Sequence, residues 1–143
     1  MFSLNLDDRL SGWASSRVKF AASDTPLQDI AEYWNAAPFT PYNKNIDPYN
    51  QKSWPTPWAI ISDNVYDDFT KALMISYTIK LLPAYANTNV EIQILTNSEK
   101  NKLYNIVIVD KTHVINYVNE VIEIENLNDN LFIDTIITVQ KPR

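Results

Sequence analysis

The chain has 143 residues and a formal net charge of −5, from 12 basic and 17 acidic side chains. It contains no Cys, one His and one Gly, which excludes thiol nucleophiles, Cys-based zinc sites and glycine-rich phosphate loops. The acidic surface disfavours non-specific binding to nucleic acid, and no apolar run approaches the ~20 residues of a membrane span. With 45% hydrophobic residues, the composition predicts one ordinary core.

The first 22 residues are expected to form an N-terminal arm or edge strand rather than a helix. Phe2, Leu4 and Leu6 alternate with polar residues, and a small, polar stretch that contains Trp13 follows. The sequence therefore divides into an arm, residues 1–22, and a single α+β domain, residues 23–143.

Three helices are predicted between residues 25 and 82. Thr25-Pro26 supplies an N-cap and a Pro at the first helical position, and apolar residues follow at i, i+3, i+4 and i+7 spacing. Thr56-Pro57 repeats this signal for a short helix. Asp63 or Asn64 is the expected cap of the third and strongest helix, which extends to Leu82.

A long proline-rich loop is predicted at residues 38–56. Loops of this length are uncommon unless they are functional or packed. Its aromatic side chains are Phe39, Tyr42, Tyr49 and Trp54. Trp54 and Trp58 flank a Pro-Thr-Pro segment, where they could plug the core of the domain, grip another protein chain, or stack on a sugar or base.

After residue 90 the apolar pattern changes to a period of two, which predicts strands. The predicted strands are residues 90–94, 103–110, 113–117, 120–125 and 132–139. The run 106–109 is apolar on both faces and marks a central strand. The fold class is therefore α+β, with N-terminal helices packed on a C-terminal antiparallel sheet of about four to five strands. Its expected core pairs Phe69 and Leu73 of the strongest helix with Ile106 and Ile108 of this strand.

The start of the third helix, Asn64-Val65-Tyr66-Asp67-Asp68-Phe69, resembles the transglutaminase-like branch of the papain-like fold. In that family the pattern is Gly-Asp-Cys-(Asp/Glu)-Asp-(Phe/His). Residues 103–110 look like the strand that carries the triad His, and residues 114–116 are similar to the strand that carries the triad Asp. Tyr66 then stands at the Cys position, Tyr104 approximately at the His position and Asn116 approximately at the Asp position. The resemblance implies a degenerate domain that has lost its acyl chemistry.

The segments Ser53-Trp54-Pro55-Thr56-Pro57-Trp58 and Tyr77-Thr78-Ile79-Lys80-Leu81 resemble small proteins encoded by tailed bacteriophages. We therefore expect a non-enzymatic structural or assembly protein of a virion, in the neck, tail or head-completion region, assembled in the host cytoplasm. Its partners are expected to be protein subunits, including copies of itself, with no cofactor, metal, membrane or direct nucleic-acid contact. The predicted partner-binding residues are Phe2, Leu4, Leu6, Trp13, Phe39, Tyr42, Tyr49 and Trp54.

Two other functions stay open. A residual hydrolase-like or metal-dependent enzyme could use an acidic cup of Asp63, Asp67 and Asp68, or Tyr66 with His113. The simpler interpretation of these acids is an N-cap with first-turn acids that favour the helix dipole. Alternatively, a small acidic effector could bind a host protein through the acids of residues 120–134, which otherwise form a solvated sheet edge.

Overall fold

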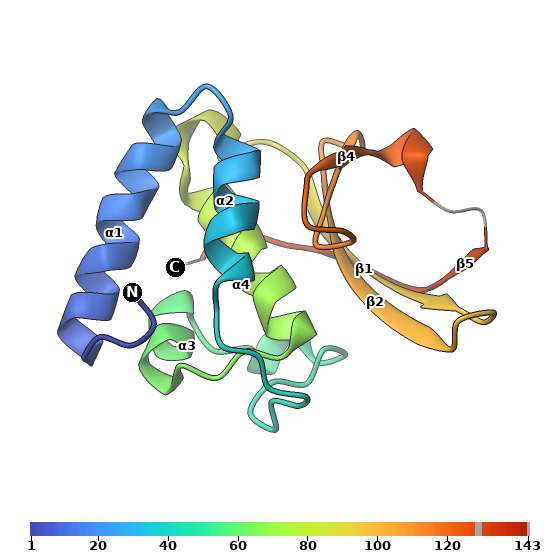
Figure 1. The fold of residues 1–143 in the computed structure, drawn as a ribbon, viewed down its shortest axis with the longest axis horizontal. Helices are drawn as coiled ribbons and strands as arrows, with labels where there is room; N and C mark the ends of the chain where they lie inside the picture. The colour runs from blue at the N-terminus through green and yellow to red at the C-terminus, as the bar shows by residue number, and fades with distance from the viewer. Residues whose placement is uncertain (128–129, 143) are drawn as a thin grey trace.

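Helices form one half of the molecule and an antiparallel sheet forms the other half (Figure 1). The computed structural model describes residues 1–127 and 130–142. The helices are α1 (Leu6–Ala22), α2 (Pro26–Asn35), α3 (Pro57–Asp63) and α4 (Asp68–Leu81). The strands are β1 (Val90–Asn97), β2 (Lys102–Val109), β3 (His113–Ile115), β4 (Ile122–Glu123) and β5 (Leu131–Thr138). The α+β prediction is confirmed.

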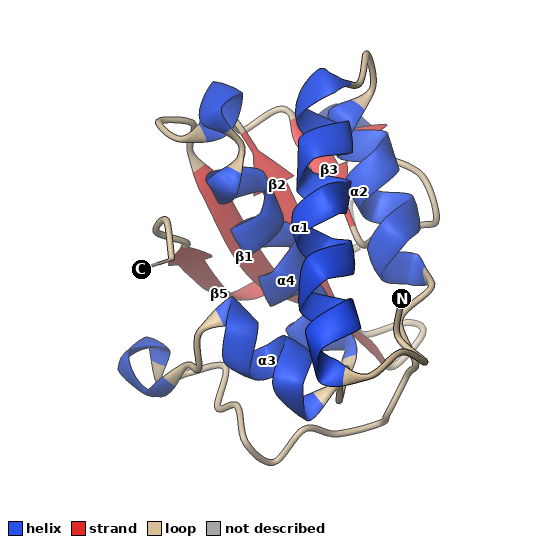
Figure 2. Cartoon of the chain, turned by 90° about the vertical axis from the view of Figure 1, so that its left-hand side faces the viewer, coloured by secondary structure: helices blue, strands red, loops and turns tan. Residues whose placement is uncertain are grey.

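Helix α4 is the central element of the molecule. It contacts α2 on one side and strands β1 and β2 on the other, with α1 in front in Figure 2. The predicted cap is wrong: Asp67 caps α4, because its side chain accepts a hydrogen bond from the Thr70 amide at 2.8 Å. Asn64 instead ends α3 in the left-handed conformation, and Asp63 is the last residue of α3.

The N-terminal segment differs most from the sequence-based expectation, since Leu6–Ala22 is a helix and not an arm or edge strand. Asn5 caps α1 by accepting a hydrogen bond from the Asp8 amide at 2.9 Å. Trp13 is fully buried, and its indole N–H donates to the Thr78 hydroxyl of α4 at 3.2 Å. The helix is therefore packed on the domain. No helix in the described part of the chain is long and apolar enough to cross a membrane.

The sheet has the strand order β4-β3-β2-β1-β5, so β2 is the central strand, as predicted. Val107 and Val109 of β2 belong to the core cluster that contains Phe69 and Leu73. Ile106 and Ile108 are also buried, but they belong to a second cluster together with Tyr104. The expectation that both isoleucines pack with Phe69 and Leu73 is wrong, because neighbouring strand residues point to opposite faces.

Candidate functional site

A polar cluster lies where α4, β2 and the end of β3 meet, and we call Asp68, Asn105 and Asn116 the Asp68 junction. The Asn105 side-chain amide donates to Asp68 Oδ2 at 2.9 Å, and the Asn116 amide donates to Asp68 Oδ1 at 3.3 Å. The Asn116 side-chain amide also donates to the backbone carbonyl oxygen of Asn105 at 2.8 Å. These are the three elements to which the family resemblance assigns the catalytic Cys, His and Asp.

Local backbone structure places each member of the junction. Asp68 is the first residue of α4 after the Asp67 cap. Asn105 lies between Tyr104 and Ile106, both of which belong to the cluster on the far face, so its side chain faces the helices. Asn116 has a φ of 69°, a left-handed conformation that Asn tolerates better than most residues. This turn follows β3 directly and lets the amide reach Asp68.

A cleft of about 290 Å³ adjoins the Asp68 junction. Its lining residues come from the 38–56 loop, the start of α4 and strands β1 and β2: Pro41, Tyr42, Ile46, Pro48, Tyr49, Asp67, Asp68, Phe69, Ile94, Leu103 and Asn105. The Tyr49 hydroxyl donates to Asp134 of β5 at 2.8 Å, and this hydrogen bond raises the pKa of Tyr49. The loop is thus tied to the sheet beside the junction.

The Asp68 carboxylate and the side-chain amide nitrogens of Asn105 and Asn116 already form hydrogen bonds within the junction. Asp68 accepts from both side-chain amides and, at 3.3 Å, from the Asn105 backbone N–H. The Asp67 carboxylate accepts from Thr70 and from the Asn43 backbone N–H. Neither an amide nor a carboxylate held in this way replaces a thiolate paired with a base, so the cluster offers no counterpart of the triad chemistry.

The other residues considered for catalysis lie elsewhere. His113 Nδ1 is 3.3 Å from Glu123, across the β3–β4 pair. Asp63 is exposed at the end of α3. No group of three or more His, Cys, Asp or Glu residues within the described ranges is placed to hold a metal ion.

Of the three expected triad positions, only Asn116 lies at the junction. Tyr66 is fully buried in the helical core, where its ring packs against Phe2 at 5.5 Å, and burial raises the pKa of its phenol. Tyr104 lies on the opposite face of the sheet, with its ring 4.9 Å from that of Tyr117. The residues that meet Asn116 at the junction are instead Asp68 and Asn105.

The predicted partner-binding residues divide into exposed and packed groups. Three loop aromatics and two N-terminal leucines are exposed: Phe39, Tyr42, Tyr49, Leu4 and Leu6. Three side chains are already packed within the chain: Phe2, Trp13 and Trp54. Trp54 packs against Phe69 with ring centroids 5.5 Å apart, and its indole N–H donates to the Asp47 carbonyl oxygen. This contact agrees with the core-plug interpretation of Trp54.

The acidic stretch 120–134 lies along β4 and the start of β5. Residues 128–129 of this stretch lie outside the described residues. Glu120, Glu123 and Glu125 are exposed, and Asp134 accepts the Tyr49 hydrogen bond.

Comparison with known proteins supports the fold. Neither a protein-family model nor a curated protein matches the sequence. The structure is similar to calcium-bound LapG of Legionella pneumophila, with a TM-score of 0.69 and 11% sequence identity over 99% of this chain and 83% of LapG. LapG has the transglutaminase-like, papain-like cysteine protease fold. At this identity the likeness concerns the fold alone, and the chain described here has that transglutaminase-like fold.

Proposed function

We propose that this chain is a non-catalytic domain of transglutaminase-like fold that acts by binding other proteins. The observation that carries the proposal is the Asp68 junction, where the Asn105 and Asn116 side-chain amides both donate to the Asp68 carboxylate. The Asn116 amide also donates to the backbone carbonyl oxygen of Asn105. The sequence contains no Cys to supply a thiolate. Fold is compatible with many functions, so the residues of the site outweigh the protease activity of LapG.

The proposed binding surface is the rim of the cleft beside the junction. Tyr42 is 74% exposed and Tyr49 is 66% exposed, while Phe39 is 63% exposed on the same loop. Tyrosine offers a large contact area with few rotatable bonds, which favours its use at protein interfaces. The setting that we propose for this binding, a bacteriophage virion, is supported by the sequence resemblance.

Site-specific crosslinking in cells that produce the chain natively tests this proposal. A photo-reactive amino acid replaces Tyr42 in one variant and Val18, an exposed residue of α1, in a matched control. We expect one protein to be crosslinked through position 42 and not through position 18, and we expect that protein to be a subunit of the same particle. Double substitution Phe39→Ala/Tyr49→Ala should reduce the crosslink.

The competing function is a residual peptidase, which the protease activity of LapG makes the natural alternative. It is tested by incubating the chain with a mixture of peptides and identifying products by mass spectrometry. We expect no cleavage. Cleavage that disappears in the Asp68→Ala variant would contradict the proposal.

A further inference from the structure

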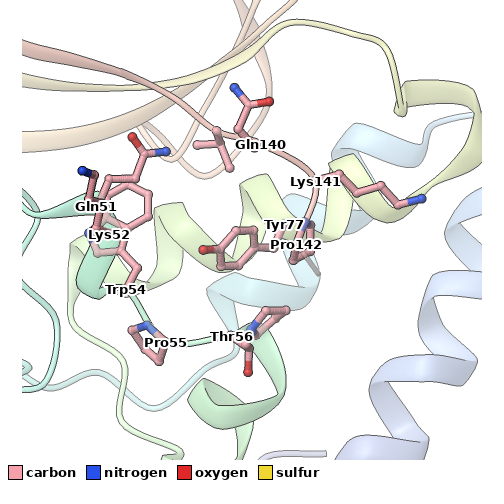
Figure 3. Close-up of a pocket in the computed structure, with 11 residues that line it drawn as sticks. Gln51, Lys52, Trp54, Pro55, Thr56, Tyr77, Gln140, Lys141 and Pro142 are labelled. Atoms are coloured by element: carbon pink, nitrogen blue, oxygen red, sulfur yellow. The ribbon is translucent and has the colours of Figure 1, made fainter.

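A second pocket lies at a distance from the Asp68 junction, and we call it the Tyr77 pocket. It has a volume of about 430 Å³ and lies between residues 51–57, the C-terminal residues 139–142 and Tyr77 of α4 (Figure 3). Tyr77 is two and a half turns beyond Asp68 on α4, which is about 14 Å along the helix axis. The cleft at the junction and the Tyr77 pocket share no lining residue.

The Tyr77 side chain gives this pocket an unpaired polar group. Tyr77 is only 8% exposed, and its hydroxyl has no hydrogen-bond partner among residues 1–127 and 130–142. Figure 3 shows this hydroxyl pointing into the pocket, toward the Trp54 side. The hydroxyl is therefore available to donate a hydrogen bond to, or accept one from, a ligand in the pocket.

Among the described residues that line the pocket, the charged side chains all have one sign. Lys52 and Lys141 line it at opposite ends, and no Asp or Glu lines it. Neither ammonium group forms an ion pair within the described part of the chain. Two lysines without a carboxylate are a local exception in a chain of net charge −5. Their flexible stems let the ammonium groups swing toward a bound anion.

The pocket is lined by both polar and apolar side chains, and one of its apolar walls is fixed in place. Pro55, Pro57 and Val139 line it together with Trp54. The Trp54 ring is held by its contact with Phe69 and by its hydrogen bond to the Asp47 carbonyl oxygen. The volume of the Tyr77 pocket lies within the range of about 300–1,000 Å³ that is usual for small-molecule sites.

From this combination we infer that the Tyr77 pocket binds a small organic anion. The apolar body of the ligand packs against Trp54, the Tyr77 hydroxyl hydrogen-bonds to its phosphate or carboxylate group, and Lys52 and Lys141 neutralise the charge. The inference is independent of the proposed function, because it does not involve the Asp68 junction or the cleft beside it.

Nuclear magnetic resonance of the whole chain labelled with ¹⁵N tests the inference. The probes are phenyl phosphate and benzoate, with inorganic phosphate and phenol as comparisons, and the Trp54→Phe spectrum identifies the Trp54 indole signal. We expect a saturable shift of that signal below about 10 mM phenyl phosphate or benzoate. Tighter binding of phenyl phosphate than of benzoate would indicate a phosphate ligand, and the reverse order would indicate a carboxylate ligand. Inorganic phosphate and phenol should each bind more weakly than phenyl phosphate, which combines the phosphate group with the aromatic ring.

Matched variants separate the pocket from a general charge effect. Lys52→Gln/Lys141→Gln should weaken binding about tenfold or more, and Tyr77→Phe about threefold or more. Lys19→Gln/Lys44→Gln changes the net charge equally at exposed lysines outside the pocket and should leave the affinity unchanged. The inference is overturned if neither probe shifts the Trp54 signal saturably, or if the control pair weakens binding as much as the pocket pair.

Discussion

At the scale of single residues, the Thr78 hydroxyl is the most heavily used polar group in the helical core. It accepts hydrogen bonds from the indole N–H groups of Trp13 at 3.2 Å and Trp34 at 3.1 Å, and it donates to the Met74 carbonyl oxygen at 2.6 Å. Both indoles are fully buried and come from different helices, α1 and α2. One hydroxyl of α4 therefore satisfies a buried donor from each of two neighbouring helices.

Thr78→Val keeps the shape of the side chain but leaves both indole N–H groups without an acceptor. We expect it to lower the free energy of unfolding by about 2–5 kcal/mol, since each unpaired buried donor carries its own desolvation penalty. Thr78→Ser retains the oxygen and should cost less than half as much. Urea denaturation of the two variants measures the difference, and equal losses would show that the hydrogen bonds to Thr78 contribute little.

The Tyr66 phenol is buried, and its hydroxyl has no hydrogen-bond partner in the part of the chain that the structure describes. Burial raises the pKa of Tyr66 above its ordinary value of 10.0. The folded state then keeps a proton that the unfolded state loses, so stability is fully present below pH 10 and falls as the pH rises above it. Burial also raises the pKa values of Tyr33 and Tyr77.

Tyr66→Phe should therefore reduce this alkaline loss of stability while costing little at neutral pH, because no hydrogen bond is removed. Urea denaturation at about pH 8 and about pH 11 measures the loss in the parent and in the variant. Tyr33 and Tyr77, whose pKa values are also raised by burial, should preserve part of the alkaline loss of stability in the variant. If the loss is the same in parent and variant, Tyr66 ionises as readily in the folded state as in the unfolded chain.

At the scale of elements, the segments with strong local signals could be predicted from the sequence. Pro26 and Pro57 each follow a Thr, and both α2 and α3 begin at the Pro. The period of two after residue 90 predicts β1 and the central position of β2. Helix α1 was missed because its fully buried side chains are only Trp13 and Phe20, seven residues apart among small and polar ones. Its apolar pattern is therefore too sparse to indicate a helix.

The sequence points to the elements that meet at the Asp68 junction, but of the three residues proposed as triad positions only Asn116 lies there. Neighbouring residues of a strand point to opposite faces of the sheet, so a candidate position that is wrong by one residue lies on the wrong face. Tyr104 and Asn105 are such a pair, because Tyr104 belongs to the cluster on the far face and the Asn105 side chain reaches Asp68. Tyr66 precedes α4 and is buried in the helical core, whereas Asp68, two residues later, is the first residue of the helix and meets Asn105 and Asn116. Asn116 lies at the junction, where its left-handed backbone directs the amide to Asp68; this conformation has no sequence signal beyond the Asn itself.

Helix α1 is held to the domain by specific contacts, so its loss should destabilise the whole chain. Besides the buried Trp13, the Arg9 guanidinium donates to the carbonyl oxygens of Ile61 and Ser62 at the end of α3. We expect Trp13→Ala to lower the free energy of unfolding by about 3–5 kcal/mol. Deletion of residues 1–20 should lower the melting temperature strongly.

The control for this prediction is Val18→Ala, also on α1, because Val18 is 71% exposed. Thermal unfolding should distinguish the two substitutions clearly. An unchanged melting temperature in the deletion variant would mean that residues 1–22 behave as a separable arm, as the sequence first indicated.

At the scale of the whole molecule, the chain combines a transglutaminase-like fold with a junction of Asp68, Asn105 and Asn116. The fold places the start of α4 against β2 and the end of β3, and the side chains there form hydrogen bonds to one another. We propose that this junction is the position of a catalytic triad whose chemistry has been replaced. If so, the arrangement of the backbone should still support a reactive thiol once suitable side chains are introduced.

The reactivity of a cysteine introduced at this position tests that claim most directly. The chain has no Cys, so Asp68→Cys creates a unique site for alkylation by iodoacetamide. Combining it with Asn105→His places an imidazole beside the thiol and should lower the thiol pKa. At about pH 6 we expect the double variant to be alkylated about tenfold faster or more than Asp68→Cys alone. Equal rates in two folded variants would contradict the assignment of the Asp68 junction as the former catalytic position.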